Sequence, residues 1–292
     1  QFVTSAATIK GGASDDVEIK SIVMTVDGSS VEVAGVINST DKRKASIETP
    51  ISAFGSLEDG YHTVVLTVTD VAGNVVTVDR KFRLDTTFPG LTLKVNGNDA
   101  TRDGTRVKGK VRLEGLLDDV NPHVLYLAVF KPGNEGYGAE EELFNDNTGL
   151  STVDKTWDTT KVKGGEYVIR FEAKDKADND SKKDVRVIVD NIAPTITIKT
   201  GASETIGHFD AKSFSLVSFK LQDAGQIDKL TLNGAEKDLT DDTFSDLNSV
   251  KPGAFGGVEG KNTLVVYDVA GNSTTLEFYL DTVAPVIDAI TL

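Results

Sequence analysis

The chain has 292 residues, 39% of them hydrophobic, and a formal net charge of −14 from 45 acidic and 31 basic side chains. This length suits about two to three domains, and the acidic balance repels phosphate backbones, which argues against nucleic acid as a partner. The lack of cysteine excludes disulfides, thiolate metal sites and cysteine nucleophiles. No apolar run approaches the ~20 residues that span a bilayer, so membrane insertion is not expected.

Residues 1–85 contain two strand patterns that end in turn signals. "IKSIVMTVDG", Ile19 to Gly28, alternates apolar and polar residues and ends in Asp-Gly, a strong signal for a two-residue hairpin turn. "HTVVLTVTDVAGNVVTVDRKFRLD", His62 to Asp85, alternates on both sides of "DVAGN". Asp70 in this turn accepts backbone N–H bonds and Asn74 tolerates left-handed backbone. The pattern therefore predicts an antiparallel hairpin with one buried face.

Residues 86–190 repeat the hairpin pattern as "YVIRFEAKDKADNDSKKDVRVIVD", Tyr167 to Asp190, with Asp175 and Asn179 in the turn. Asp178 stands where the first copy has glycine, so we expect a somewhat different turn. Tyr167 is placed where such folds often have a corner tyrosine, and Trp157 is expected in the core, because sandwiches of this kind commonly bury one tryptophan.

The longest irregular segment of the chain is Lys131 to Asp154. A loop beyond ~12 to 15 residues is uncommon unless it is functional or disordered, and "AEEELF" within it could form one helical turn. The segment is either a structural embellishment or a recognition surface for a host protein, a matrix protein or a glycan. Its candidate binding residues are Tyr137, Glu140, Glu141, Glu142 and Phe144.

Residues 191–281 contain a third copy, "TLVVYDVAGNSTTLEFYLD", with Asp268 and Asn272 in its turn. The three turn aspartates are spaced 105 and 93 residues apart, which is a domain period and exceeds the roughly 20 to 50 residues of a solenoid repeat. Helical periodicity is almost absent. The sequence therefore predicts an all-β fold of three tandem immunoglobulin/fibronectin III-like β-sandwiches in an elongated array.

The predicted domains are 1–85, 86–190, with the long loop 131–154, and 191–281. Each ends in a proline linker, at Pro89, Pro194 and Pro285, that leads into another alternating segment. Residues 282–292 should therefore start a fourth, truncated repeat. Because the linkers are short and proline fixes φ, we expect semi-rigid junctions. The expected partners are the neighbouring domains of the same polypeptide, in a chain that is itself a monomer.

These motifs, together with "KTWDTTKVKGGEY" at Lys155 to Tyr167, resemble the tandem immunoglobulin-like or fibronectin type III-like domains of Gram-positive cell-surface proteins. They are most similar to the non-catalytic modules of lactocepin and C5a-peptidase-type cell-envelope proteinases. The resemblance implies an extracellular location at a bacterial cell surface or cell wall. It also implies a spacer that positions an attached protease or adhesive domain or, alternatively, an adhesin.

Catalysis is not expected from this sequence. The three histidines, His62, His123 and His208, fall one in each predicted domain, whereas catalytic groups must converge in one site. With no cysteine and no histidine pair, a zinc site is not expected either.

Calcium is the one cofactor that the junctions suggest. "VDNIAP", Val189 to Pro194, is similar to the Asp-Asn-x-x-Pro motif of cadherin linkers, which makes Asp190 and Asn191 candidate calcium ligands. Calcium takes about six to eight oxygens, so these two would have to recruit others, from Asp118 and Asp119 or from Asp241 and Asp242. We favour the alternative that the junction aspartates cap their turns and that the chain holds no cofactor.

Overall fold

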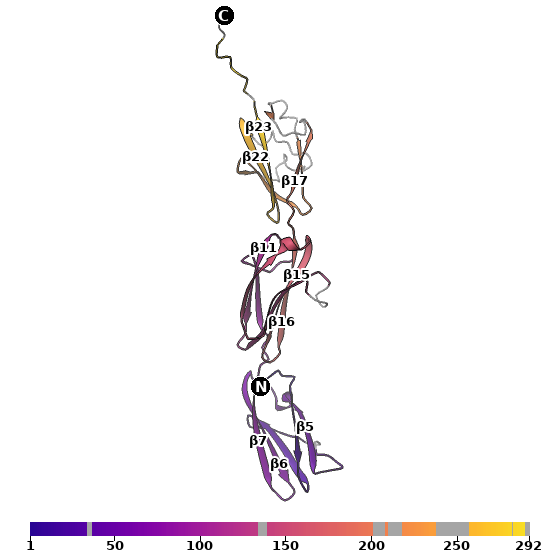
Figure 1. The fold of residues 1–292 in the computed structure, drawn as a ribbon. Coiled ribbons are helices and arrows are strands. Elements are labelled where there is room, and N and C mark those ends of the chain that lie inside the picture. Colours follow the sequence, from indigo (N-terminus) through magenta and orange to yellow (C-terminus); the bar gives the residue numbers. More distant parts are fainter. Residues whose placement is uncertain are drawn as a thin grey trace. The chain divides into compact units, whose positions relative to one another are not determined.

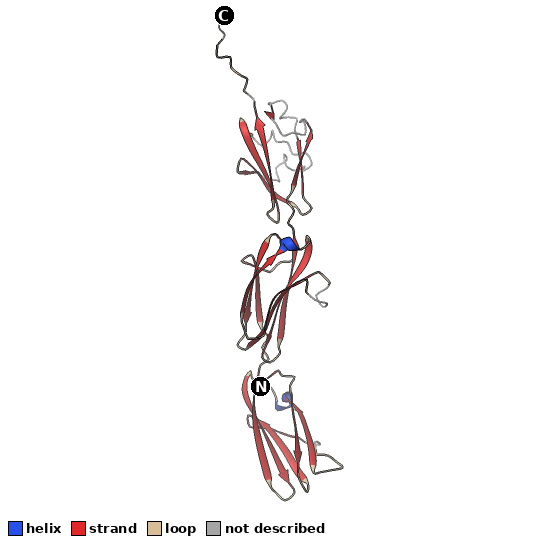
Figure 2. Cartoon of the chain, in the orientation of Figure 1, coloured by secondary structure: helices blue, strands red, loops and turns tan. Residues whose placement is uncertain are grey.

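The computed structural model describes residues 1–33, 37–133, 139–200, 208–209, 218–237, 257–281 and 283–289. Its regular structure consists of strands and two short 3₁₀ turns (Figure 2). Contacts group the chain into two compact units: Gln1–Thr101 with Arg112–Lys155 and Ile169–Val185, and Arg102–Val111 with Thr156–Val168 and Arg186–Leu292. The predicted all-β fold of immunoglobulin or fibronectin III kind is confirmed, while the division into three domains stays a prediction. We call residues 1–85, 86–190 and 191–281 the first, middle and last repeats.

The first repeat has a five-stranded sheet in the order β1-β7-β6-β3-β4 and a two-stranded sheet, β2-β5 (Figure 1). Its elements are β1 (Phe2–Val3), β2 (Thr8–Ser14), β3 (Ile19–Val26), β4 (Ser29–Glu32), β5 (Lys44–Pro50), η1 (Ile51–Phe54), β6 (Gly60–Asp70) and β7 (Val75–Leu84). The core between the sheets includes Met24, Ile47 and Phe82.

The middle repeat has a five-stranded sheet in the order β10-β16-β15-β12-β13 and a four-stranded sheet, β14-β11-β8-β9. Its elements are β8 (Gly90–Val95), β9 (Asn98–Asp99), β10 (Thr105–Val107), β11 (Lys110–Asp118), β12 (Pro122–Phe130), β13 (Glu141–Asp146), β14 (Thr152–Asp158), η2 (Thr159–Lys161), β15 (Gly165–Asp175) and β16 (Asp180–Val189). Trp157 is fully buried, as predicted, and packs edge-on against Tyr167 with the ring centroids 5.3 Å apart.

The last repeat has a five-stranded sheet in the order β18-β23-β22-β20-β21 and the pair β17-β19. Its elements are β17 (Thr195–Thr200), β18 (His208–Phe209), β19 (Ser218–Gln222), β20 (Ile227–Leu232), β21 (Ala235–Lys237), β22 (Gly260–Asp268) and β23 (Ser273–Leu280). Phe219 and Phe278 pack together in its core. As predicted, each proline linker within the chain leads into a strand, β8 after Pro89 and β17 after Pro194.

The three hairpin turns share one backbone geometry, which corrects the expectation of a different middle turn. Asp178 has a φ of 68°, in the same left-handed region as Gly73 at 93° and Gly271 at 83°. All three N–H groups donate to the carbonyl of the turn aspartate. Aspartate tolerates left-handed backbone better than most residues, so Asp178 adopts the glycine conformation.

The long segment of the middle repeat also differs from the prediction. Residues Glu141 to Asp146 form β13, which pairs antiparallel with β12, where a loop and a helical turn were expected. The alternation was hidden because the strand begins with two consecutive exposed glutamates, Glu141 and Glu142, and because its pairing with β12 has a register shift at Leu127/Ala128.

A corner hydrogen bond recurs in all three repeats with three different side chains. The Tyr167 hydroxyl donates to the Lys163 carbonyl at 2.9 Å. His62 Nε2 lies 2.8 Å from the Glu58 carbonyl, and Asn262 Nδ2 donates to the Val258 carbonyl at 2.7 Å. Each bond joins a strand residue to the carbonyl four residues earlier, so the backbone corner is kept while the side chain varies.

Candidate metal centres

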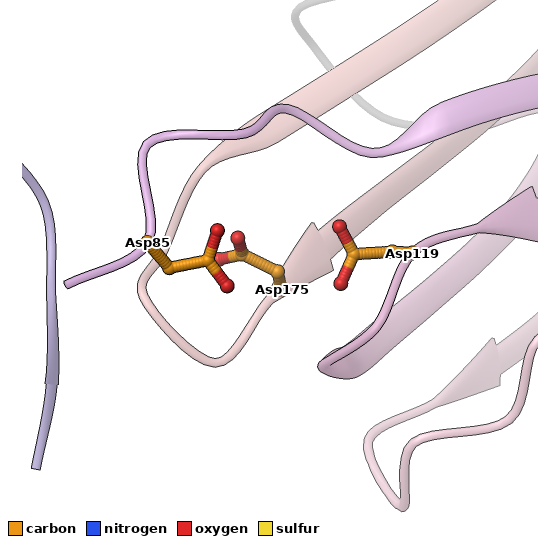
Figure 3. Close-up of side chains that lie close together, drawn as sticks. All are labelled: Asp85, Asp119 and Asp175. Carbon is orange, nitrogen blue, oxygen red and sulfur yellow. The ribbon is translucent and has the colours of Figure 1, made fainter. Parts of the chain in front are cut away.

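Three aspartates from different elements converge at the junction that follows the first repeat (Figure 3). One carboxylate oxygen from each of Asp85, Asp119 and Asp175 lies within 4.8 Å of the others. Asp85 follows β7, Asp119 follows β11, and Asp175 ends β15. Asp85 and Asp175 are buried, with exposed fractions of 5% and 0%, and Asp119 is half-buried.

Neutral N–H donors satisfy part of this cluster. Asn121 donates its side-chain amide to Asp85 Oδ2 at 2.7 Å and its backbone N–H to Asp119 Oδ1 at 2.6 Å. Asp175 Oδ1 accepts the backbone N–H groups of Ala177 and Asn179, at 2.8 and 2.9 Å. These donors hold the three carboxylates in place without neutralising their charge.

The pKa of Asp119 is raised above its ordinary value. Burial raises this pKa, and the N–H bond from Asn121 works in the opposite direction. The neighbouring carboxylates, Asp175 first and then Asp85, raise it further. Because like charges and burial both disfavour the ionised form, a cation among the three carboxylates would relieve a real electrostatic cost.

Asn179 fastens the linker to the turn beside this cluster. Its side-chain amide lies 3.0 Å from the Asp85 carbonyl, 3.3 Å from the Thr87 carbonyl and 2.8 Å from Asp175 Oδ2. The predicted turn residues Asp175 and Asn179 therefore do more than close a hairpin, because they also bind the backbone of the preceding linker.

The same arrangement recurs after the middle repeat, with Asp190, Asp223 and Asp268 within 4.8 Å of one another. Asn272 repeats the role of Asn179. Its side-chain amide lies 2.9 Å from the Asp190 carbonyl, 3.3 Å from the Ile192 carbonyl and 2.8 Å from Asp268 Oδ2. The junction is therefore a repeated structural element of this chain.

The second cluster differs by one cation. Arg106 Nη1 lies 3.1 Å from Asp190 Oδ2, and both side chains are largely buried. A Cβ atom at Gly225 would come within 2.7 Å of the same Arg106 nitrogen and of Asp190 Oδ2, so glycine leaves the space that the guanidinium occupies. Among the described residues, by contrast, no lysine or arginine forms an ion pair with the three aspartates of the first cluster.

The oxygen ligands suit a hard divalent cation. Three carboxylates offer up to six oxygens, and calcium takes about six to eight, including water and carbonyl oxygens. The first cluster fits calcium better than the second, where Arg106 already supplies a positive charge.

The predicted calcium ligands are only partly brought together. Asp190 belongs to a cluster, but the Asn191 side chain accepts the Gly109 N–H and donates to the Thr159 carbonyl within the middle repeat. Asp119 joins Asp85 at the first junction, not Asp190 as suggested. Asp241 and Asp242 lie outside the described residues.

Sequence reasoning overlooked Asp223 and gave Asp85 only the role of a junction aspartate that caps its turn. One signal was present: Asp15, Asp119 and Asp223 are spaced 104 residues apart, each just after a strand of the second sheet. Each accepts the backbone N–H group two residues later through its side chain. An Asx turn of this kind is common in loops, so the spacing alone did not reveal its partners.

Of the candidate binding residues of the middle repeat, the four that the structure describes do not join either cluster. Glu140, Glu141 and Glu142 are exposed at and before β13, the outer strand of its sheet. Lys155 Nζ lies 5.0 Å from the centre of the Phe144 ring. Tyr137 lies outside the described residues.

Known proteins give a family resemblance for part of the chain. The model of the family described as Bacterial Ig-like domain (group 3) matches residues 151–278. No curated protein sequence matches the chain. No helix in the described part of the chain is long and apolar enough to cross a bilayer.

Solved structures similar to this chain include fibronectin(III)-like modules and adhesin segments. Fibronectin(III)-like modules of Clostridium thermocellum CbhA are 13% identical with a TM-score of 0.35, covering 65% of this chain and 90% of that chain. A Ca²⁺-stabilized adhesin of an Antarctic bacterium is 16% identical with a TM-score of 0.33, covering 96% and 71%. A tetra-tandem repeat from the extending region of a large adhesion protein is 18% identical with a TM-score of 0.30, covering 95% and 72%.

Proposed function

We propose that this chain is a non-catalytic, extracellular segment of a bacterial surface protein, whose sandwiches form a spacer that positions an attached protease or adhesive domain. The observation that carries the proposal is the repeated junction. At both junctions an asparagine amide binds two carbonyls of the linker, and the linker aspartate joins two aspartates of the following repeat.

Such a junction suits a spacer because it makes the linker part of the next sandwich. A tether of free residues would let neighbouring sandwiches reorient, whereas each hydrogen bond of the junction contributes roughly 0.5–1.5 kcal/mol against that freedom. The proline after each linker aspartate removes further backbone freedom. Restricting the linker in this way at both junctions is useful for a spacer, whereas catalysis does not require it.

Small-angle scattering of the whole chain tests the spacer. We expect a stiff particle with a maximum dimension on the order of 100 Å or more, since each sandwich is about as long as its longest strands, roughly 30–36 Å at ~3.3 Å per residue, and three would lie end to end. The double variant Asn179→Ala/Asn272→Ala should give a broader distribution of dimensions. Asn147→Ala, at an exposed position of the middle repeat, is the matched control. A compact globule, or a double variant identical to the control, would contradict the proposal.

Calcium at the first junction is a second proposal, favoured by the cluster of Asp85, Asp119 and Asp175. Bound to the native state alone, the ion would stabilise the protein by about 2.7 kcal/mol at a free concentration 100 times its Kd. The unfolding temperature should therefore rise with free calcium and fall in chelator. Asp119→Asn should abolish the response, while the exposed Asp16→Asn should keep it. If millimolar calcium does not change the unfolding temperature of the wild-type protein, the aspartates only cap their turns.

The alternative function, an adhesin, rests on the exposed edge of the middle repeat. β13 is the outer strand of its sheet, and an outer strand can pair with an extended segment of a partner. Because β13 is part of the sandwich, deleting Lys131 to Asp154 would damage the fold. Replacing Glu140, Glu141 and Glu142 by alanine is the better test: adhesion should be lost with the melting temperature unchanged.

A further inference from the structure

A hollow of about 350 Å³ lies beside the acidic cluster of the first junction. Its volume falls in the range of about 300–1,000 Å³ that is usual for small-molecule sites. The charged residues of its lining are Asp59, Asp85, Asp118, Asp119 and Arg83, and all of them belong to one compact unit of the chain. The hollow therefore suits a small charged ligand better than an apolar one.

The four carboxylates of this lining are not equally available. Asp59 accepts three hydrogen bonds from the linker at 2.8–2.9 Å, and Asp85 accepts the Asn121 amide at 2.7 Å. Asp119 uses Oδ1 for the Asn121 N–H. Its Oδ2 and both oxygens of the exposed Asp118 accept no hydrogen bond from the described residues. Asp118 and Asp119 are therefore the carboxylates that a ligand can reach.

Arg83 adds a positive charge to the same lining. Its guanidinium carbon lies 5.3 Å from the centre of the Phe2 ring and 5.4 Å from that of the exposed Tyr61 ring, so two cation–π contacts position the side chain. The arginine ion pairs of the described structure involve other arginines. Since a guanidinium binds a carboxylate through two parallel N–H bonds, Arg83 can bind an anionic group of a ligand.

The second junction forms without these charged side chains. Gln222 stands there in place of Asp118, and Ile188 stands in place of Arg83. Asn272 nevertheless binds two carbonyls of the linker. Because the junction forms with neutral residues at both positions, Asp118 and Arg83 are not needed to fasten the linker.

An organic cation already occupies the acidic cluster of the second junction. The Arg106 guanidinium lies 3.1 Å from Asp190 Oδ2. A Cβ atom at Gly225 would come within 2.7–2.8 Å of Arg106, Asp190 and Asp223, so the cation and both carboxylates meet at one point. At the first junction Phe2 occupies the strand position of Arg106, and the hollow leaves room for a cationic group that a ligand supplies.

We propose that this hollow binds a ligand with an ammonium group and a carboxylate on one short aliphatic chain, as in free lysine or a lysine at the C-terminus of a peptide. Asp118 and Asp119 bind the ammonium group, and Arg83 binds the carboxylate. Val120, which lines the hollow and is 84% exposed, contacts the aliphatic chain. This binding is separate from the spacer role and from calcium, because Asp118 is not one of the three clustered aspartates.

Calorimetric titration of the whole chain with ε-aminocaproate, in chelator, tests the site. This probe carries both charges, whereas hexylamine lacks the carboxylate and caproate lacks the ammonium group. We expect saturable binding of ε-aminocaproate and about tenfold weaker binding of either single-charge probe, because each loses a hydrogen-bonded charge. The proposal fails if ε-aminocaproate does not bind, or if hexylamine binds equally well.

Substitutions at the two ends of the site give independent readouts. Asp118→Asn should weaken ε-aminocaproate and hexylamine alike, by about tenfold, whereas the exposed Asp16→Asn should weaken neither. Arg83→Gln should weaken ε-aminocaproate to the level of hexylamine. The matched control is Arg80→Gln, an exposed arginine on the same strand. Variants that bind as their controls do would overturn the proposal.

Melting temperatures separate loss of binding from loss of fold. Asp118 is exposed, so Asp118→Asn should melt as the wild-type protein does. Because Arg83 packs between two rings, Arg83→Lys serves as a second variant that keeps the charge and should retain preference for ε-aminocaproate over hexylamine. If it shows no such preference, a positive charge at this position does not bind the carboxylate and the proposal is wrong.

Two further titrations identify the source of the ligand. Free lysine is compared with a short peptide that ends in lysine and with the C-terminal amide of that peptide. Binding of the peptide acid assigns the site to the C-terminus of a partner protein, and binding of free lysine alone assigns it to the amino acid. An amide that binds as tightly as the acid would contradict the role of Arg83 and overturn the proposal.

Discussion

The two acidic clusters have the same backbone frame but differ in how their charge is balanced. Asp85, Asp119 and Asp175 have only neutral N–H donors around them in the described structure, while Asp190 has Arg106. Arg106 lies on β10, opposite Ile188 of β16; in the first repeat the corresponding position of β1, opposite Arg83 of β7, is Phe2. The two clusters therefore share their backbone and turn residues, and a single variable strand position decides whether an arginine balances the acidic charge.

Removing Arg106 should have the largest effect on the difference in charge balance between the two acidic clusters. Breaking a buried ion pair costs about 3–5 kcal/mol, and because the Arg106 side chain is 21% exposed we expect roughly 1–3 kcal/mol for Arg106→Ala. The variant should also become calcium-responsive, since its second cluster then matches the first. Denaturant unfolding with and without calcium measures both effects.

Arg112→Ala is the matched control, because Arg112 and Asp154 form an exposed ion pair. Such pairs contribute about 0–1 kcal/mol. If Arg106→Ala costs no more than this control and gains no calcium response, the guanidinium does not balance the second cluster.

Substitutions of Asp119 and Asp223, which occupy the same position in the two clusters, should change stability less than removal of Arg106. In chelator, Asp119→Asn should stabilise the protein by roughly 1 kcal/mol, because it removes repulsion among three close carboxylates and keeps an oxygen for the Asn121 N–H. Asp223→Asn should be neutral or destabilising, since Arg106 offsets the charge there. Thermal melts of both variants in chelator measure the two changes in stability. Equal shifts of the melting temperature would show that Arg106 does not offset the negative charge of the second cluster.

The sequence predicted the strands and turns well because their signals are local. Alternation placed β6, β7, β15 and β16, and the Asp-Gly pair placed a two-residue turn, where Asp27 has a φ of 49°. The clusters could not be predicted in the same way. Each joins loops about 30 to 60 residues apart in the chain, and Arg106 reaches Asp190 across 84 residues.

A smaller difference between the repeats lies in the hairpin turn. Asp178 holds a left-handed φ of 68° where the other turns have glycine. Glycine adopts this region without steric cost, so Asp178→Gly should stabilise the middle repeat or leave it unchanged, within about 1 kcal/mol, and Gly73→Asp should cost a similar amount in the first. Chemical denaturation measures both. A large loss in Asp178→Gly would mean that the Asp178 side chain has a role of its own.

The smallest effect is a pH dependence at the corner bond, where the first repeat has His62 and the middle repeat has Tyr167. Burial lowers the pKa of His62, but the hydrogen bond from its Nδ1 to Asp27 Oδ2, 2.6 Å long, the contact with the Glu58 carbonyl and the Asp27 charge outweigh it, so the pKa is raised above its usual value. The Thr63 N–H and then His62 lower the pKa of Asp27.

A histidine whose pKa is raised on folding contributes stability that is fully present below its unfolded value, near 6.5, and is lost as the pH rises through the folded value. The first repeat should therefore lose a little stability between about pH 6 and pH 8. Asp27 acts in the opposite direction, because its contribution is lost only as the pH falls below its usual range, near 4. His62→Tyr places the middle repeat's corner residue in the first repeat, and unfolding followed across this pH range should then be flat, because tyrosine does not ionise there. The ion pair between His62 and Asp27 is not the cause of the pH dependence if the stability of the wild-type protein is already constant between about pH 6 and pH 8. The same holds if the stability of His62→Tyr still falls over that range.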